Sequence, residues 1–119
     1  MSFADVLQRR RMVRNFDDRE LPREQISALI DRARRAPSAG NTSATEFLVL
    51  HGAEQTERYW NTTLTAERRT GFPWPGLLKA PVLVIPLSDP QAYLDRYGES
   101  DKAHTGLGEA VEQLSLIHI

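Results

Sequence analysis

The sequence contains no cysteine, and this absence excludes several kinds of site. Disulfide bonds, thiolate metal centres, iron–sulfur clusters and a cysteine nucleophile all require that side chain. The three histidines, His51, His104 and His118, stand far apart and form no recognisable metal motif. We therefore predict no metal site. A Ser-His-Asp signature of nucleophilic catalysis is not recognisable either.

The sequence also lacks a large excess of charge of one sign, and it lacks long apolar runs. Fifteen basic and 16 acidic side chains give the 119 residues a net charge of −1, which argues against a nucleic-acid binder. No apolar run approaches the roughly 20 residues that cross a bilayer, and the N-terminus has no stretch typical of a signal peptide. We expect a cytoplasmic protein of one domain at most, with neither nucleic acid nor membrane as a partner.

Helical spacing of apolar residues predicts several helices. Ser2 and Asp5 have the spacing of a capping box, so a helix is expected to begin there. Pro22 suits the first turn of a second helix, which Pro37 limits. The apolar residues expected on the buried face of this second helix are Ile26, Leu29, Ile30 and Ala33. Further helices are expected over residues 53–68 and 90–97.

Two short apolar runs, residues 47–50 and 81–86, predict buried strands. A strand that is apolar on both faces needs helices on both sides and neighbours at its edges. Two strands alone do not make an independently stable sheet. We therefore expect more chain or a partner subunit to complete this sheet.

The segment from Arg10 to Phe16 carries the clearest chemical signal. Arg10, Arg11 and Arg14 lie close together at the expected end of the first helix. Guanidinium groups at this spacing can converge on one phosphate dianion, because their planar forks bond its oxygens bidentately. The alternative is a solvated helix end whose cations complement the helix dipole.

A second candidate segment is the loop Pro37–Ser43, which follows the second helix. Its small side chains would let a flat ring approach the backbone. Asn41 could offer a donor and an acceptor to the edge of a heterocycle. An ordinary helix-to-strand loop is the alternative, and this loop alone does not separate the two.

Together these segments resemble the nitroreductase family of FMN enzymes. The resemblance rests on Arg10-Arg11-x-x-Arg14-x-Phe16, then Ala36-Pro37-Ser38 with Asn41, then the apolar strand 47–50 and Lys79-Ala80-Pro81 before the next strand. It covers residues 3 to about 90. It implies an α+β fold with a central, mostly antiparallel sheet flanked by helices, incomplete in this chain. It also implies an intertwined homodimer with two FMN molecules at the subunit interface.

The resemblance also implies which residues hold FMN. The arginine segment of one subunit holds the phosphate and ribityl chain, and the Pro-Ser loop of the partner lies against the isoalloxazine ring. The implied FMN-binding residues are Arg10, Arg11, Met12, Arg14, Pro37, Ser38, Ala39 and Asn41. The sequence departs from the family at Met12, often a serine there, and at 42–45, where the family commonly has x-Gln-Pro-Trp.

A lid is a further implication of the resemblance. Residues 57–79 correspond to a segment that often covers the substrate face in this family. Its aromatic residues would offer surface to a flat electron acceptor. They are Tyr59, Trp60, Phe72 and Trp74. The alternative is that these side chains pack as core.

The implied function is that of an oxidoreductase. Hydride would pass from NAD(P)H to FMN and then to a nitroaromatic, a quinone or another flavin. In this mechanism no side chain need be a nucleophile or a general base. One alternative is a flavoenzyme of the same fold that performs reductive dehalogenation or flavin breakdown. Others are a non-enzymatic flavin- or nucleotide-binding protein and a basic-helix module that binds acidic lipid or nucleic acid through Arg9–Arg14.

The last six residues, 114–119, look foreign to such a domain. They resemble the translation of a transposon-end adaptor used in sequencing libraries. We expect residues 1–113 to be the N-terminal part of a single nitroreductase-like domain and 114–119 to be a non-native tail. A genuine terminal strand is the alternative. On this expectation the function belongs to the full-length parent, and the fragment itself has little or no activity.

Overall fold

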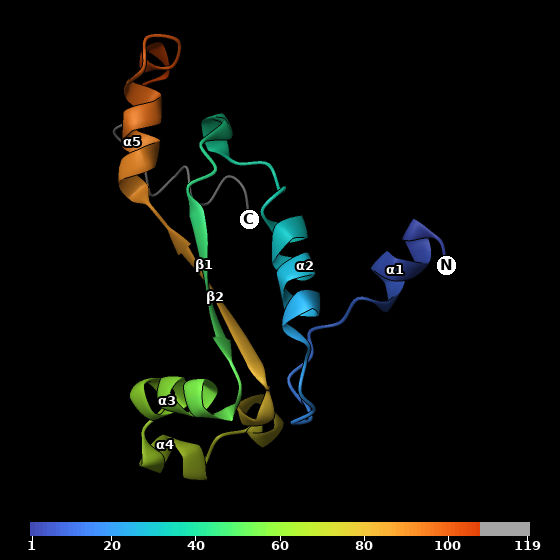
Figure 1. Cartoon of the computed structure of the whole chain (residues 1–119). Coiled ribbons are helices and arrows are strands. Elements are labelled where there is room, and N and C mark those ends of the chain that lie inside the picture. Colours follow the sequence, from blue (N-terminus) through green and yellow to red (C-terminus); the bar gives the residue numbers. More distant parts are fainter. Residues whose placement is uncertain (108–119) are drawn as a thin grey trace. The chain divides into compact units, whose positions relative to one another are not determined.

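The computed structural model describes residues 1–107 and contains helices and a two-stranded sheet (Figure 1). The chain divides into two compact units. The first consists of Met1–Glu20 and Leu50–Leu83, and the second of Leu21–Val49 and the described residues from Val84 onward. The predictions for 108–119, including the non-native tail, lie outside the described residues.

The sheet is antiparallel. Its strands are β1, Thr45–His51, and β2, Val82–Ser88. The N–H of Gly52 donates to the carbonyl of Pro81 at 2.9 Å, and the N–H of Asp89 donates to the carbonyl of Ala44, also at 2.9 Å. The end of one strand thus pairs with the start of the other. Both predicted strands are confirmed, and β2 continues two residues beyond Pro86.

Burial of the strands is where the sequence prediction is wrong. Leu48 is 46% exposed and Val84 is 42% exposed, so each strand carries apolar side chains open to solvent. The apolar pattern shows what surface a strand is suited to contact, and residues 1–107 cover these two side chains only in part.

The first unit begins with helix α1, Phe3–Arg9, which has the predicted capping box. The N–H of Asp5 donates to Ser2 Oγ at 3.2 Å, and the N–H of Ser2 donates to Asp5 Oδ2 at 2.7 Å. These two bonds satisfy donors that the helix leaves free at its start. Hydrogen bonds from the backbone N–H and the hydroxyl of Ser2 to the Asp5 carboxylate also lower the pKa of Asp5, because they stabilise its ionised form.

The single helix predicted over 53–68 is instead two helices, α3, Ala53–Thr63, and α4, Ala66–Thr70. The break lies at Leu64, whose backbone is extended with φ −129° and ψ 102°. The hydroxyls of Thr62 and Thr63 donate to the carbonyls four residues earlier, at 2.9 Å each. Such β-branched residues and back-bonding side chains disfavour continued helix, which accounts for the break. A 3-10 turn, Pro75–Lys79, precedes β2.

The second unit contains helices α2, Arg23–Ala33, and α5, Pro90–Gly98. It also has 3-10 turns at Ala39–Asn41 and Ala103–Thr105. Both helices were predicted, but the buried stripe of α2 is largely wrong. Ile26 is buried and Ile30 is half-buried, whereas Ala33 is exposed and Leu29 is 57% exposed.

The small core of the second unit lies between the Pro-Ser loop and α5. Ala39 and Tyr97 are its buried members, and Tyr93 and Leu107 pack against them. This core places the loop directly on the helix. None of the helices within residues 1–107 combines the length and the apolar character needed to span a membrane.

Candidate functional site

The arginine segment starts where helix α1 ends. Arg10 has an extended backbone with φ −60° and ψ 125°, and its N–H donates to the carbonyls of Val6 and Leu7 at 3.0 and 3.3 Å. Arg10, Arg11 and Arg14 are exposed, and no carboxylate within residues 1–107 pairs with them. Three guanidinium groups are therefore available to an anion from outside the described chain.

The far end of the segment is fixed against the turn Pro75–Lys79. The N–H of Phe16 donates to the carbonyl of Gly76 at 3.0 Å. A Cβ at Gly76 would overlap the Asn15 side chain and come within 3.1 Å of the Asn15 Cα. Glycine thus allows the two backbones to approach closely, and the end of the arginine segment is held in place.

Arg14 differs from the other two arginines because it lies over an aromatic ring. Its guanidinium carbon is 5.1 Å from the centroid of Trp74, within the range of a cation–π contact. Trp74 in turn meets Phe72 edge to face, with ring centroids 6.0 Å apart. Trp74 is exposed, so this pair offers an aromatic surface next to the arginine segment.

The other two aromatic residues of the expected lid pack more deeply. Tyr59 and Trp60 are half-buried and meet edge to face at 5.1 Å. Here the alternative of core packing describes the side chains better. The indole Nε1 of Trp60 is buried and has no hydrogen-bond partner in the part of the chain that the structure describes.

The Pro-Ser loop is closed by its own hydrogen bonds. Ser38 Oγ accepts from the N–H of Ser43 at 2.8 Å. The N–H of Asn41 donates to the Ser38 carbonyl at 3.0 Å, and Thr42 Oγ1 donates to the Ala39 carbonyl at 2.6 Å. Gly40, Asn41 and Ser43 have φ values of 59°, 55° and 52°, all in the left-handed region. The loop is therefore a defined turn with local strain.

Several groups of this loop are free to meet a ligand. The Ser38 hydroxyl is used as an acceptor, which leaves its hydrogen to donate. Asn41 is exposed, and its side-chain amide has no partner within residues 1–107. Ala39 differs, because its side chain is buried against Tyr97. Any contact of Ala39 with a ligand must therefore use its backbone.

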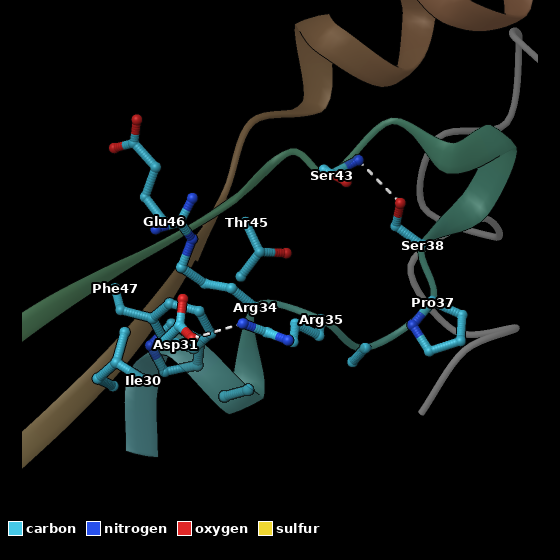
Figure 2. Close-up of a pocket in the computed structure, with 13 residues that line it drawn as sticks. Ile30, Asp31, Arg34, Arg35, Pro37, Ser38, Ser43, Thr45, Glu46 and Phe47 are labelled. Atoms are coloured by element: carbon cyan, nitrogen blue, oxygen red, sulfur yellow. Dashed lines mark hydrogen bonds and ion pairs between the residues drawn. The ribbon is translucent and has the colours of Figure 1, made fainter. Parts of the chain in front are cut away.

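Pro37 and Ser38 lie on the wall of an open pocket of about 930 Å³ (Figure 2). Its lining residues come from the end of α2, from the Pro-Ser loop, from β1 and from β2. They are Ile30, Asp31, Ala33, Arg34, Arg35, Ala36, Pro37, Ser38, Ser43, Thr45, Glu46, Phe47 and Pro86. Arg35 is paired with Asp31 at 3.0 Å. Ala39 and Asn41 do not line this pocket.

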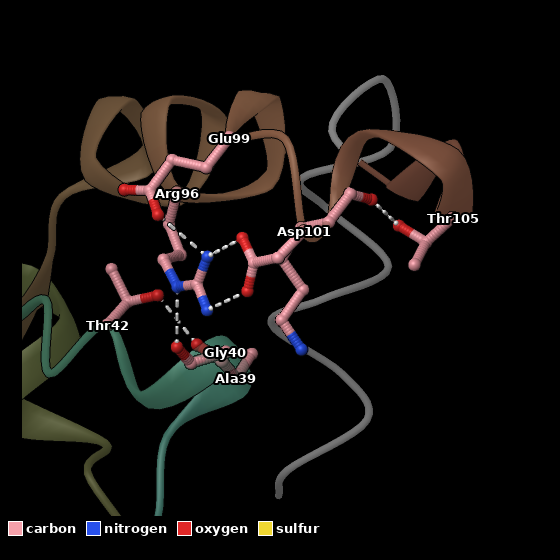
Figure 3. A network of polar contacts seen from close by, with 8 residues as sticks. Ala39, Gly40, Thr42, Arg96, Glu99, Asp101 and Thr105 are labelled. Carbon is pink, nitrogen blue, oxygen red and sulfur yellow. Dashed lines mark hydrogen bonds and ion pairs between the residues drawn. The ribbon is translucent and has the colours of Figure 1, made fainter.

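Arg96 of α5 was missed by the sequence analysis, although it holds the loop (Figure 3). Its Nε donates to the Gly40 carbonyl at 2.9 Å. Its two terminal nitrogens donate to the carboxylate oxygens of Asp101 at 2.9 and 3.0 Å, and Nη1 also meets Glu99 at 2.9 Å. We call these four residues the Arg96 network. Nothing in the sequence links Gly40 to a residue 56 positions away.

Arg96 and Asp101 shift each other's proton affinity. The hydrogen bonds from Arg96 lower the pKa of Asp101, and the same bonds raise the pKa of Arg96. A carboxylate whose folded pKa is lowered adds stability above its unfolded pKa and loses that contribution as pH falls through the folded value. The Arg96 network is thus complete at neutral pH.

The hydrogen bonds of the Arg96 network are therefore expected to break only when the pH falls below the ordinary pKa of an aspartate, about 3.9. The charged groups that act on Arg96 or on its partner carboxylate are Asp101, Glu99 and Lys102. NMR of the Arg96 Nε–H signal during an acid titration measures this transition. In Asp101→Asn this transition should be absent. A transition close to neutral pH would contradict this assignment.

The predicted site residues thus form two groups. Arg10, Arg11, Met12 and Arg14 lie in one exposed segment of the first unit, and Pro37, Ser38, Ala39 and Asn41 lie in one loop of the second unit. Met12 is exposed and offers a thioether where the family often has a hydroxyl. Three features of the site were not predicted from the sequence. They are the bond of Arg96 to the loop, the close approach at Gly76 and the Arg14–Trp74 contact.

Comparison with known proteins identifies relatives of the chain. The sequence profile of the Nitroreductase family matches residues 7–116. A protein of Methanothermobacter thermautotrophicus, provisionally named an NADH dehydrogenase/NAD(P)H nitroreductase, is 33% identical over 58 residues, which are 49% of this chain and 30% of that protein. A crystal structure from Staphylococcus epidermidis, provisionally named an NAD(P)H:FMN oxidoreductase, is 28% identical with a TM-score of 0.60. That match covers 94% of this chain and 46% of the other.

One further structure shows the shared fold. It is a provisionally named nitroreductase from Exiguobacterium sibiricum, solved in complex with FMN. It is 19% identical, has a TM-score of 0.66, and is matched over 99% of this chain and 64% of its own length. The expected α+β, nitroreductase-like fold is therefore confirmed. The chain spans less than two thirds of each of these three relatives.

Proposed function

Because the chain belongs to the nitroreductase family, we propose that its parent protein is an FMN-dependent oxidoreductase that passes hydride from NAD(P)H to a small-molecule acceptor. One observation carries the proposal. It is the exposed segment with Arg10, Arg11 and Arg14, which no carboxylate of residues 1–107 neutralises.

The donor chemistry of this segment fits the phosphate of FMN. A phosphate dianion is best held by several charge-assisted hydrogen bonds, and arginine supplies them in a planar fork. In this proposal Arg10, Arg11 and Arg14 bind the phosphate and neighbouring parts of FMN. Met12 contributes its backbone N–H. The hydrogen bond from Phe16 to Gly76 keeps the end of this segment in place.

The Pro-Ser loop would supply the other side of the flavin site, from the partner subunit of a homodimer. Ser38 can donate its hydroxyl hydrogen to a ring acceptor, and the Asn41 amide offers both a donor and an acceptor. Pro37 would give an apolar contact to the ring. Ala39 would contribute through its backbone, since its side chain is buried.

When bound, FMN supplies the hydride chemistry. The chain's part is to hold the phosphate, to shelter one face of the ring and to admit a flat acceptor. Phe72 and Trp74 offer an aromatic surface for such an acceptor beside Arg14. No side chain is required as a nucleophile or general base, so we assign no catalytic residue. A nitroaromatic or a quinone is the proposed acceptor class.

We further propose that residues 1–113 are the N-terminal part of a longer domain and that 114–119 are not native to it. The partial coverage of the relatives supports the first part of this proposal, that residues 1–113 belong to a longer domain, since the chain spans 46% of the Staphylococcus epidermidis structure. The exposed apolar side chains Leu29, Leu48 and Val84 support it too. They are surfaces that the rest of such a domain or a partner subunit would cover.

Turnover tests the activity. The parent protein reconstituted with FMN is mixed with NADH or NADPH and with a nitroaromatic, a quinone, free riboflavin, an enone or a halogenated aromatic. We expect oxidation of the nicotinamide to speed up with the nitroaromatic or the quinone. Turnover of the halogenated aromatic alone would indicate reductive dehalogenation instead. FMN binding without turnover of any acceptor would contradict an oxidoreductase and favour a flavin-binding protein.

A further inference from the structure

We propose that Arg96 is a positioning residue for the flavin site: it holds the Pro-Ser loop in the turn that presents Ser38 and Asn41 to the isoalloxazine ring. This inference rests on the proposed function, because it assigns Arg96 a role in FMN binding without contact to FMN. It concerns a residue far from the loop in sequence and outside the segments that resemble the family's FMN motifs.

The contacts of Arg96 engage all three nitrogens of its guanidinium group. Nε is bound to the Gly40 carbonyl at 2.9 Å, and the two terminal nitrogens are bound to the Asp101 carboxylate in a bidentate pair. Glu99 adds a further bond to Nη1. The carboxylates fix the orientation of the fork, and the fork in turn fixes the Gly40 carbonyl. Only a planar group with donors on several sides can do both.

The segment that Arg96 holds is strained. Gly40, Asn41 and Ser43 all have left-handed φ values, and two of the three are not glycine. Such residues keep this conformation only when the surrounding contacts impose it. Asn41, the exposed amide proposed to meet the flavin, lies in the middle of this stretch.

Packing reinforces the polar contact. A Cβ placed at Gly40 would lie 3.1 Å from Tyr97 Cε2 and 3.2 Å from Arg96 Cγ, so the stem of Arg96 and the Tyr97 ring leave little room for a side chain at this position. Ala39 is buried against the same tyrosine. Helix α5 therefore holds the loop on two sides, through a hydrogen bond to a carbonyl and through contact with small residues.

Loss of the guanidinium would remove the partner of the Gly40 carbonyl and leave Asp101 and Glu99 without their counterion. The turn could then relax from its left-handed conformation. Ser38 and Asn41 would change position relative to each other. A lysine would retain the charge but lack the fork, so Arg96→Lys is expected to restore the turn only in part.

Two measurements on the same variants test this inference. Hydrogen–deuterium exchange of residues 39–43 reports on the turn without any flavin, and quenching of flavin fluorescence gives the FMN affinity. The variants are Arg96→Met and Arg96→Lys. The matched control is Arg69→Met, because Arg69 is a similarly covered arginine, 26% exposed against 23% for Arg96, and makes one ion pair with Glu57 in the other unit. All are made in the form of the protein that binds FMN, either the chain itself or its native extension.

We expect Arg96→Met to speed exchange at residues 39–43 and to weaken FMN binding by about tenfold, which corresponds to the loss of about one ordinary hydrogen bond between the loop and the flavin. Arg96→Lys should lie between it and the wild type, and Arg69→Met should leave both readouts unchanged. Faster exchange with unchanged FMN affinity overturns the inference and leaves the proposed function standing. Equal loss of affinity in Arg69→Met also overturns it. Wild-type protein that takes up no FMN overturns the proposed function itself, and the exchange data then show only what Arg96 does for the turn.

Discussion

Replacement of Arg10 and Arg14 together by alanine is expected to weaken FMN binding by at least about 100-fold. Hydrogen bonds to charged groups contribute roughly 1.5–3 kcal/mol each, so two of them account for a loss of this size. Arg14→Ala also removes the contact with the Trp74 ring, 5.1 Å from its guanidinium carbon. Titration of free FMN by fluorescence quenching measures the change.

The control for this prediction must remove the same charge from elsewhere. Arg23 and Arg32 are exposed residues of α2 without a carboxylate partner among residues 1–107. The double variant Arg23→Ala with Arg32→Ala has the same net charge as the test variant. We expect it to bind FMN almost as the wild type does. Equal losses in the two double variants would mean that the arginine segment acts only through general electrostatic attraction and is a solvated helix end.

Replacement of Gly40 by alanine is expected to destabilise the protein by roughly 2–5 kcal/mol. A left-handed conformation costs an ordinary residue about 1–2 kcal/mol. Overpacking adds about 1–3 kcal/mol, because the new Cβ would lie 3.1 Å from the Tyr97 ring and 3.2 Å from the Arg96 stem. The free energy of unfolding, taken from urea titration, measures the effect.

Gly98 provides the matched glycine. It is the last residue of α5, in the same unit, and a Cβ there would meet nothing within 4 Å. We expect Gly98→Ala to change the free energy of unfolding by less than about 0.5 kcal/mol, as surface substitutions usually do. If Gly40→Ala is as mild as Gly98→Ala, the turn at Gly40 is not held as the structure describes it, and Arg96 has no strained turn to hold.

The secondary structure could largely be predicted from local signals. The capping box of Ser2 and Asp5 and the apolar runs at 47–50 and 81–86 depend on near neighbours in the sequence, and each led to an element that the structure contains. Burial could not be predicted in the same way. Leu48 and Val84 carry the pattern of a buried strand and yet are exposed, because burial depends on what else packs against the sheet.

In the candidate site, too, local motifs could be predicted from the sequence and tertiary contacts could not. The arginine run and the Pro-Ser loop are short, contiguous patterns, and the resemblance to the family identified them. The Arg96 network joins residues far apart in the chain, and a single sequence carries no signal for such a pair. The close approach of Gly76 to Asn15 is also a tertiary contact. The motifs give the ligand chemistry, and the structure gives the contacts that hold the motifs in shape.

The most direct test of this account is whether the protein binds FMN. The 119-residue chain and the proposed extended protein, in which residues 1–113 continue into the rest of the domain, are purified with FMN, washed and examined by flavin absorbance and fluorescence. We predict that the extended protein retains FMN and is yellow, and that Arg10→Ala with Arg14→Ala bleaches it. An extended protein that folds but takes up no FMN would contradict the account, since the arginine segment would then have no phosphate to bind.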